Sequence, residues 1–118
     1  MGTESIPELV RGYFAAYQRG DRAWVAARLA PGFTFTSPYD DHIDTATYFE
    51  RCWPDQPWVR EFRFEKIVAD GDDAFVLYEA VPMEGESFRN TEHMRFENGR
   101  LRAVEVYFGA LPKAGDAV

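Results

Sequence analysis

The sequence has 118 residues, which is the size of one domain with a single core. Hydrophobic residues make up 46% of it and aromatic residues 16%, a composition that argues against a disordered chain. The net charge is −7 without a cluster of Lys or Arg, so nucleic acid and anionic membranes are unsuitable partners. No apolar run reaches membrane-spanning length and no signal-peptide core is present. The single cysteine, Cys52, fits a reducing compartment, so we expect a cytoplasmic protein.

The first half of the chain is predicted to be mainly helical. Ser5 and Glu8 form a capping box, apolar residues at helical spacing follow, and Gly20 ends the first helix. Asp21 and Asp44 are N-cap residues of two further helices. In chain order we expect helices over about 5–19, 21–30 and 44–53, with a short strand over 33–36 and a loop over 37–42.

The second half changes to an apolar period of two, which is typical of strands. Turn residues at 70–72, 84–85 and 97–99 divide it into a meander. The predicted strands run over about 58–69, 74–81, 87–96 and 100–109. The order α-α-β-α-β-β-β-β indicates an α+β fold, with a curved antiparallel sheet packed against the N-terminal helices. We treat residues 1–118 as one domain, with a core over about 5–109 and a frayed tail over 110–118.

The last hairpin can pair in two registers, which differ in the residue that faces Glu92. A two-residue Asn98-Gly99 turn places Glu92 opposite Glu105 and brings two carboxylates inside. A three-residue loop with Gly99 as a bulge residue places Glu92 opposite Val104 and sends Glu105 outside. We choose the second register because it puts only apolar residues of the last strand beside the core, namely Val104, Val106 and Phe108 next to Met94 and Phe96.

Two carboxylates then lie among apolar side chains. Glu92 shares its face with Met94 and Phe96, and Glu79 is predicted to share a face with apolar residues of its own strand, opposite Asn90. Burying an unpaired carboxylate is costly, so such a group must be paired, protonated or next to a wet cavity. A raised pKa is expected where water is scarce.

The chain resembles the SnoaL-like and ketosteroid-isomerase-like proteins of the nuclear transport factor 2 superfamily. The run from Glu92 to Arg100, with Tyr107 to Gly109 at the end of the next strand, is similar to the C-terminal hairpin of that family. Gly12 to Ala16 and the later Gly20-Asp21 resemble its first helix. The element order agrees over about residues 5 to 109, and the segment from Ser37 to Pro54 is similar to bacterial SnoaL-like proteins without an assigned activity.

This resemblance implies a cone-shaped fold with a deep pocket between helices and sheet. In ketosteroid isomerases a first-helix tyrosine and a protonated acid donate to the substrate oxyanion, and an aspartate before a proline is the base. Tyr13 and Glu92 match the two donors, whereas Ser37 before Pro38 occupies the position of the base. Serine is not a usable base alone, so steroid isomerisation is not expected. Asp40 and Asp41, a few residues on, are the nearby carboxylates that can replace it.

The candidate catalytic residues are therefore Tyr13, Asp40, Glu79 and Glu92, and those expected to contact a ligand are Trp24, Phe33, Ser37, Tyr39, Asn90, Met94 and Phe108. Each has a structural alternative: Tyr13 can be a core residue, and Glu92 can pair with Arg60 or Arg102. No metal site is expected, because the segment over 40–44 offers one imidazole among loop carboxylates. Cys52 is interpreted as an inert thiol.

Two functions follow from these residues. One is a small-molecule enzyme of the isomerase, cyclase, dehydratase or hydrolase type, acting on a small apolar, polyketide-like or steroid-like molecule by acid–base chemistry, with no cofactor. The alternative is a non-catalytic module that binds an apolar ligand or a partner. In either case we expect a homodimer through the outer sheet face, which carries Glu105 and Tyr107.

Overall fold

The chain folds into three helices and six strands in a computed structural model that describes residues 5–109. The predicted tail over 110–118 lies outside the described residues. The helices are α1 (Ile6–Arg19), α2 (Arg22–Ala26) and α3 (Thr45–Cys52), and the strands are β1 (Leu29–Ser37), β2 (Asp40–Ile43), β3 (Val59–Asp70), β4 (Asp73–Pro82), β5 (Phe88–Glu97) and β6 (Arg100–Phe108).

Each helix begins at the cap that the sequence predicts. Ser5 Oγ accepts the Glu8 amide at 3.2 Å, and Glu8 Oε1 accepts the Ser5 amide at 2.9 Å. Asp21 and Asp44 cap α2 and α3 by accepting backbone N–H groups in the same way. Gly20 ends α1 in the left-handed region, at φ 78°, which glycine adopts without strain. The second helix is shorter than predicted, because residues 29 and 30 already belong to β1.

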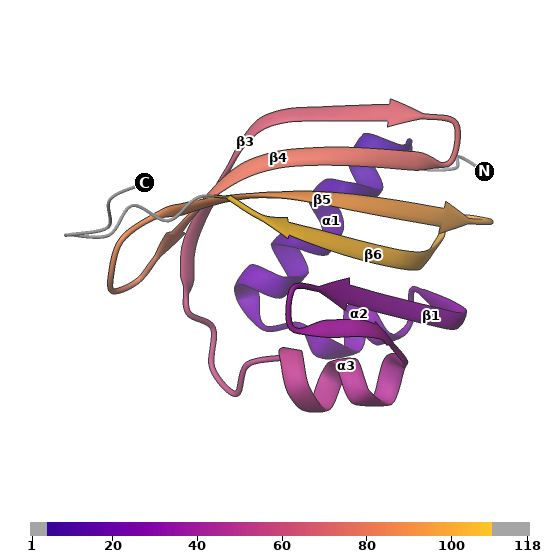
Figure 1. Ribbon diagram of the computed structural model, residues 1–118, viewed down its shortest axis with the longest axis horizontal. Helices are drawn as coiled ribbons and strands as arrows, with labels where there is room; N and C mark the ends of the chain where they lie inside the picture. The colour runs from indigo at the N-terminus through magenta and orange to yellow at the C-terminus, as the bar shows by residue number, and fades with distance from the viewer. Residues whose placement is uncertain (1–4, 110–118) are drawn as a thin grey trace.

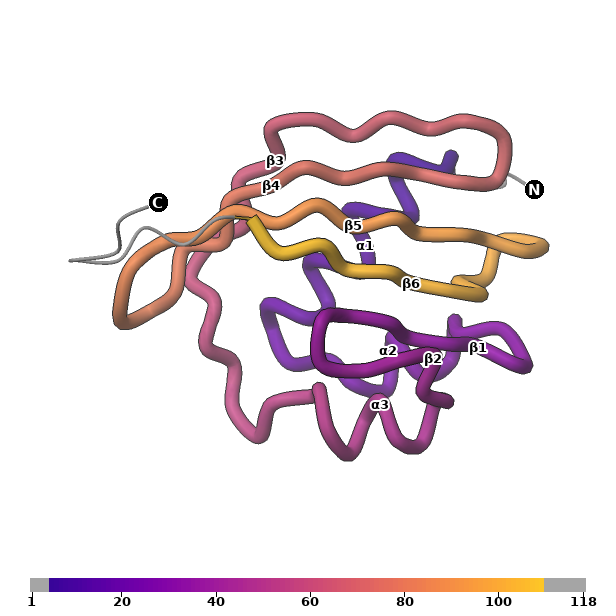
Figure 2. Tube along the Cα trace, in the orientation of Figure 1, coloured from indigo at the N-terminus to yellow at the C-terminus, as the bar shows by residue number. Residues whose placement is uncertain are grey.

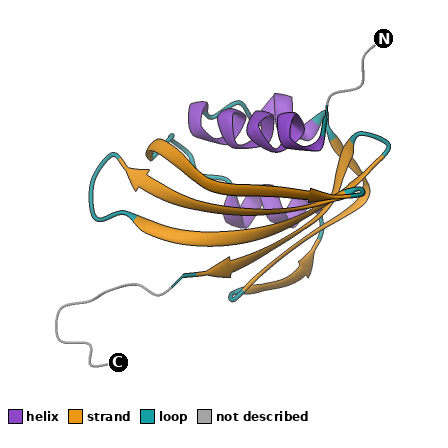
Figure 3. Cartoon of the chain, turned by 90° about the horizontal axis from the view of Figure 1, so that it is seen from above, coloured by secondary structure: helices purple, strands orange, loops and turns teal. Residues whose placement is uncertain are grey.

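The six strands form one curved sheet in the order β2-β1-β6-β5-β4-β3, and the helices cover its concave face (Figures 1 and 3). The predicted α+β class with N-terminal helices against a curved sheet is confirmed. Two details differ. β1 pairs with β6 in parallel, so the sheet is mixed, and these segments from opposite halves of the chain lie side by side (Figure 2). The sequence prediction also missed β2, because its four residues are mostly polar and lie at the sheet edge.

The register of the last hairpin differs from both predicted registers. Phe96 pairs with Leu101 across a two-residue turn of Asn98 and Gly99, whose φ angles are 52° and 79°. A β-bulge then follows, because Arg95 pairs with Ala103 and leaves Arg102 unpaired. Beyond the bulge Glu92 faces Val106 rather than Val104, and Glu105 faces His93 on the outer side. The predicted facing of Val104, Val106 and Glu105 is thus correct, although the register chosen to explain it is wrong.

The predicted facing of Glu79 is wrong. The β4–β5 loop spans residues 83–87 rather than a two-residue turn, so Asn90 pairs with Tyr78, and Glu79 pairs with Arg89. Glu79 lies on the convex face and forms an ion pair with Arg63 at 3.5 Å. The concave face of β4 instead carries Ala74, Val76, Tyr78 and Ala80, all of them buried.

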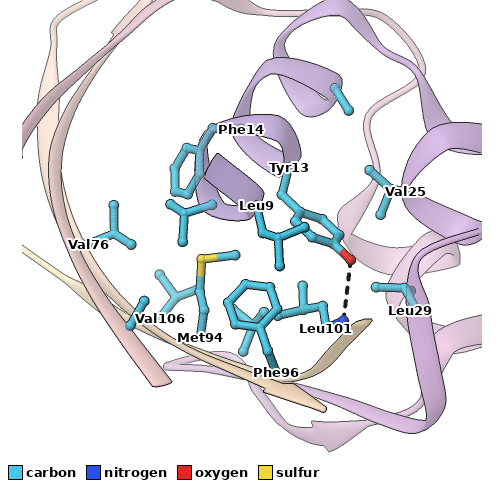
Figure 4. Close-up of a cluster of buried hydrophobic side chains, with 14 of the residues drawn as sticks. Leu9, Tyr13, Phe14, Val25, Leu29, Val76, Met94, Phe96, Leu101 and Val106 are labelled. Carbon is cyan, nitrogen blue, oxygen red and sulfur yellow. Dashed lines mark hydrogen bonds between the residues drawn. The ribbon is translucent and has the colours of Figure 1, made fainter. Parts of the chain in front are cut away.

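The core lies between α1 and the concave face of β4, β5 and β6 (Figure 4). Tyr13 projects from α1 toward the start of β6, where its hydroxyl donates to the Arg28 carbonyl at 2.5 Å and accepts the Leu101 amide at 3.3 Å. These two hydrogen bonds connect α1 to β6 and to the segment that precedes β1. The ring packs against Trp24 and Phe96, with centroids 5.2 and 6.0 Å away.

We expect Tyr13→Phe to lower the free energy of unfolding by about 1 kcal/mol, because the Arg28 carbonyl loses its buried hydroxyl donor while the ring contacts stay. Urea unfolding followed by circular dichroism measures this change. Tyr39→Phe is the matched control, since the Tyr39 side chain is exposed, with 76% of its surface accessible. Equal stability of the two variants would contradict a structural role for the Tyr13 hydroxyl.

Candidate functional site

A cavity of about 380 Å³ lies between the concave sheet face and helices α1 and α3. Its walls are mostly aromatic and aliphatic, as is usual for a small-molecule pocket. Glu92 is the one carboxylate among the described residues that line it. The lining residues are Tyr13, Phe14, Tyr17, Val25, Leu29, Phe33, Phe35, Tyr48, Cys52, Trp53, Trp58, Phe62, Tyr78, Ala80, Phe88, Asn90, Glu92, Met94, Leu101, Val104, Val106 and Phe108.

Glu92 projects into this cavity from the middle of β5. Its Oε2 atom accepts a hydrogen bond of 2.6 Å from the Tyr78 hydroxyl. Its Oε1 atom has no hydrogen-bond partner among the described residues, and neither Arg60 nor Arg102 forms an ion pair with it there. The carboxyl therefore has one anchored oxygen and one oxygen open to a ligand.

The apolar surroundings favour the neutral form of this acid. Burial raises the pKa of Glu92 to about 7, and the hydrogen bond from Tyr78 acts in the opposite direction by stabilising the carboxylate. A carboxyl with such a pKa holds its proton in part of the molecules at neutral pH. It can then either give or take a proton without a large energetic penalty.

Tyr78 is held in place by a chain of hydrogen bonds that reaches the end of β6. Asn90 Nδ2 donates to the Tyr78 hydroxyl at 3.4 Å, and Asn90 Oδ1 accepts the Gly109 amide at 3.3 Å. The Gly109 amide also donates to the Arg89 carbonyl at 2.8 Å. A Cβ atom on Gly109 would lie 2.1 Å from that carbonyl oxygen, so glycine is required where the strands converge beside Tyr78.

Tyr13 and Asp40, which were also predicted to be catalytic, use their side-chain oxygens in hydrogen bonds and ion pairs within the protein. The Tyr13 ring lines the cavity, but its hydroxyl is bonded to the backbone of Arg28 and Leu101. Asp40 is not among the lining residues, and its Oδ1 atom accepts Arg51 Nη2 at 2.6 Å. Asp40 Oδ2 accepts the hydroxyl of Ser37 at 3.3 Å, so these two predicted residues pair with each other outside the cavity.

Of the seven residues predicted to contact a ligand, four line the cavity: Phe33, Asn90, Met94 and Phe108. Ser37 lies at the β1–β2 turn, and Trp24 packs behind Tyr13 with the Arg28 guanidinium over its ring. Tyr39 is 76% exposed and contacts the Phe108 ring from outside.

Three tyrosines that line the cavity, Tyr17, Tyr48 and Tyr78, were not among the predicted site residues. Tyr78 was missed because the β4–β5 register was one residue off, although alternation with Val76 and Ala80 is visible in the sequence. Tyr17 and Tyr48 lie on helices, where their spacing indicates burial but not a cavity.

Cys52 also lines the cavity, and burial raises the pKa of its thiol to about 11, with the nearby Asp40 acting in the same direction. The thiol is therefore protonated at neutral pH and a weak nucleophile. Among residues 5–109 no group of three or more His, Cys, Asp or Glu side chains is arranged to hold a metal ion. Nor does this part of the chain contain a helix that is long and apolar enough to cross a lipid bilayer.

A curved sheet that encloses an aromatic pocket under short helices defines the NTF2-like class of domains. The sequence pattern of the SnoaL-like domain family matches residues 10–104, and the chain therefore belongs to that family. The predicted family resemblance is confirmed. A comparison with curated proteins found no match.

Several solved structures share the whole fold at low sequence identity. An NTF2-like protein of unknown function from Cytophaga hutchinsonii is 21% identical, with a TM-score of 0.71 over 92% of this chain and 95% of its own. An LEH-like epoxide hydrolase of M. tuberculosis is 22% identical, with a TM-score of 0.70 over 88% and 82% of the two chains. AclR of Streptomyces galilaeus, a proposed hydroxylase, is 16% identical, with a TM-score of 0.72 over 92% and 91%.

We expect Glu92→Gln to stabilise the protein at pH 8 by up to about 3 kcal/mol, because the neutral amide avoids the burial of a charge. The native pKa of Glu92 lies at about 7, above its ordinary value of 4.5, so the native protein loses stability as the pH rises from about 4.5 to about 7. The gain from the substitution should therefore vanish below about pH 4.5. Urea titrations at several pH values measure it.

Glu84→Gln is the matched control for this series, because Glu84 is exposed on the β4–β5 loop. This substitution removes one negative charge that is already exposed to water, so it relieves no desolvation cost. A native stability that does not fall between pH 4.5 and 7 relative to Glu92→Gln would contradict the desolvation of Glu92.

Proposed function

We propose that the protein is a small-molecule enzyme that moves a proton on an apolar substrate, with Glu92 as its acid–base group. The observation that carries this proposal is the Glu92 carboxyl itself, which has one oxygen anchored by Tyr78 and the other open to an aromatic cavity. Its raised pKa suits a group that both takes and returns a proton near neutral pH.

The chemistry that fits this site is proton transfer next to a carbonyl group. As a carboxylate, Glu92 takes a proton from the carbon beside the carbonyl, and the electron pair of that C–H bond moves to form an enolate. The neutral acid then returns the proton to the same or another carbon. Isomerisation follows this course. In cyclisation the enolate carbon instead attacks a second carbonyl carbon of the substrate, and the acid protonates the alkoxide that forms; in dehydration the enolate expels a hydroxyl group from the next carbon, which leaves as water with the proton of Glu92. None of the three uses an organic cofactor.

The substrate class follows from the walls of the cavity. With a volume of about 380 Å³ and mostly aromatic lining, it suits a compact apolar molecule of the polyketide or steroid type. The epoxide hydrolase among the structural neighbours makes hydrolysis a related option for the same carboxyl. Tyr78 and Asn90 are positioning residues in this scheme, because they orient the carboxyl.

2-Tetralone tests the proposal, because it is an apolar bicyclic ketone with acidic hydrogens beside its carbonyl. We expect the native protein in D₂O to speed exchange of these hydrogens for deuterium by about 10²-fold or more over Glu92→Gln. Mass spectrometry measures the exchange. The rate should rise with pH and reach half its maximum near pH 7, as Glu92 loses its proton.

Glu84→Gln serves again as the control and should exchange at the native rate. Exchange that is equally fast with native protein and with Glu92→Gln would contradict the role of Glu92. A Tyr78→Phe variant should retain exchange but shift its pH profile upward, since the carboxylate loses its hydrogen-bond donor.

The alternative function is non-catalytic binding of an apolar ligand. The position that carries the base in ketosteroid isomerases is Ser37, and the neighbouring Asp40 is paired with Arg51, so no second carboxylate enters the cavity from the described residues. Saturable binding of 2-tetralone without any exchange would support this function instead.

We also propose that two copies pair through the convex sheet face and that the protein acts in the bacterial cytoplasm. That face exposes Phe75 and Tyr107, with 46% and 56% of their surfaces accessible. His93 stacks on Phe75 at 4.4 Å between ring centroids and contacts the carboxylates of Asp73 and Glu105. Large aromatic side chains exposed on a sheet face, here among ion pairs such as Arg63–Glu79, mark a surface that can bind another chain.

Sedimentation velocity should give a dimer for the native protein and a monomer for Phe75→Asp, because the charge would be buried in the interface. Val68→Asp, at a second exposed position on the neighbouring strand β3, tests how far the interface extends. A native monomer at micromolar concentration would contradict the dimer.

A further inference from the structure

Tyr48 of α3 lies in the wall of the cavity opposite the sheet. Its ring packs against Phe33 and Phe35 of β1, with centroids 5.6 and 4.9 Å away, and against Phe49 at 5.2 Å. These aromatic contacts fix the ring on three sides. The same residue lines the cavity, so the hydroxyl at the end of the ring is held in a defined place.

The Tyr48 hydroxyl has no hydrogen-bond partner among residues 5–109. Every fully enclosed side-chain nitrogen or oxygen of the described residues has such a partner, so the Tyr48 hydroxyl must border open space. A tyrosine hydroxyl that lies in an apolar region ordinarily finds a partner. Here the space that it borders is the cavity, and a ligand atom is the partner that the cavity can supply.

The other tyrosines of the cavity already use their hydroxyl groups. Tyr13 donates to the Arg28 carbonyl, and Tyr78 donates to Glu92. Tyr17 accepts the indole N–H of Trp58 at 2.9 Å and keeps its own proton undonated, so it competes with Tyr48 as a donor. The indole N–H of Trp53 is a second competitor, because Trp53 lines the cavity and this group has no hydrogen-bond partner among residues 5–109. Among the side-chain oxygens that line the cavity in the described part of the chain, only Tyr48 Oη and Glu92 Oε1 have no partner.

These two open oxygens lie within electrostatic reach of each other. Burial raises the pKa of Tyr48, and the charges of Tyr17 and Glu92 raise it further. The phenol consequently stays protonated over the whole range in which Glu92 titrates, and it remains a hydrogen-bond donor whether or not Glu92 is charged.

We propose that Tyr48 is the hydrogen-bond donor that binds the oxygen of the ligand, so that the substrates are apolar ring compounds with a carbonyl oxygen. This inference rests on the proposed function, because Glu92 exchanges a proton with the molecule that Tyr48 orients. A ligand held in this way presents its carbonyl to α3 and the neighbouring carbon to the sheet. Tyr48 thereby determines which molecules bind and which of their carbons meets Glu92.

The test compares the binding of 2-tetralone with that of tetralin, which has the same ring skeleton without the oxygen. Dissociation constants are measured at pH 9 by competition with a fluorescent apolar dye, because Glu92 is then charged and cannot donate to the carbonyl. Tyr48→Phe should raise the dissociation constant of 2-tetralone about three- to tenfold, which corresponds to the loss of one neutral hydrogen bond, and leave the dissociation constant of tetralin unchanged. Tyr107→Phe removes a hydroxyl outside the cavity and should change neither constant.

Thermal unfolding establishes first that Tyr48→Phe is folded, which the retained ring contacts favour. Unchanged affinity of Tyr48→Phe for 2-tetralone would overturn the assignment, and so would a loss of affinity confined to Tyr17→Phe or to Trp53→Phe. Neither result would contradict the role of Glu92, because deuterium exchange tests that role separately. Failure of the native protein to bind either probe would contradict the cavity as a ligand site and overturn both proposals.

Discussion

The desolvated carboxyl of Glu92 is the feature on which the site depends. Most buried acids in proteins are neutralised by a guanidinium or by several backbone amides, and their pKa then falls. Among residues 5–109 Glu92 has only the Tyr78 hydroxyl as a partner, at 2.6 Å, and this one hydrogen bond is too weak to offset the loss of water. The fold tolerates this arrangement because the cavity next to the carboxyl leaves one oxygen accessible rather than enclosed. The open oxygen of this acid can therefore form a hydrogen bond or exchange a proton with a molecule that enters the cavity.

The geometry around that acid is set by a single extra residue in β6. Odd-numbered positions face the core at the start of β6, as Leu101 shows, and even-numbered positions do so after the bulge at Arg102. The shift places Val106 beside Glu92 and keeps Glu105 on the convex face. Without the bulge, the alternation would bring a second carboxylate into the pocket, where two negative charges would repel. The bulge thus keeps Glu92 the single acid of the described cavity wall.

Much of the fold could be predicted from local signals, because caps, turns and apolar periods report the conformation of nearby residues. Ser5, Asp21 and Asp44 mark the helix starts correctly, and the inward facing of Glu92 follows from its neighbours Met94 and Phe96. The rest depends on pairing between distant segments. The face of Tyr78 and the parallel contact of β1 with β6 are decided by loop length and by tertiary contacts that no short window of sequence contains. For the same reason the hydroxyl of Tyr13 could not be assigned to the backbone of Arg28 and Leu101.

The parallel pairing of β1 with β6 also governs the order in which this chain can fold. Thr34 of β1 pairs with Ala103 of β6, so the hydrogen bonds that hold the β1–β2 hairpin in the sheet require the last strand. During synthesis the first half of the protein therefore leaves the ribosome with an unfinished strand edge and an uncovered aromatic wall. Closure of the cavity waits for the C-terminal hairpin, and contacts of such long sequence separation form slowly. The pocket consequently cannot be completed before the C-terminal hairpin is in place.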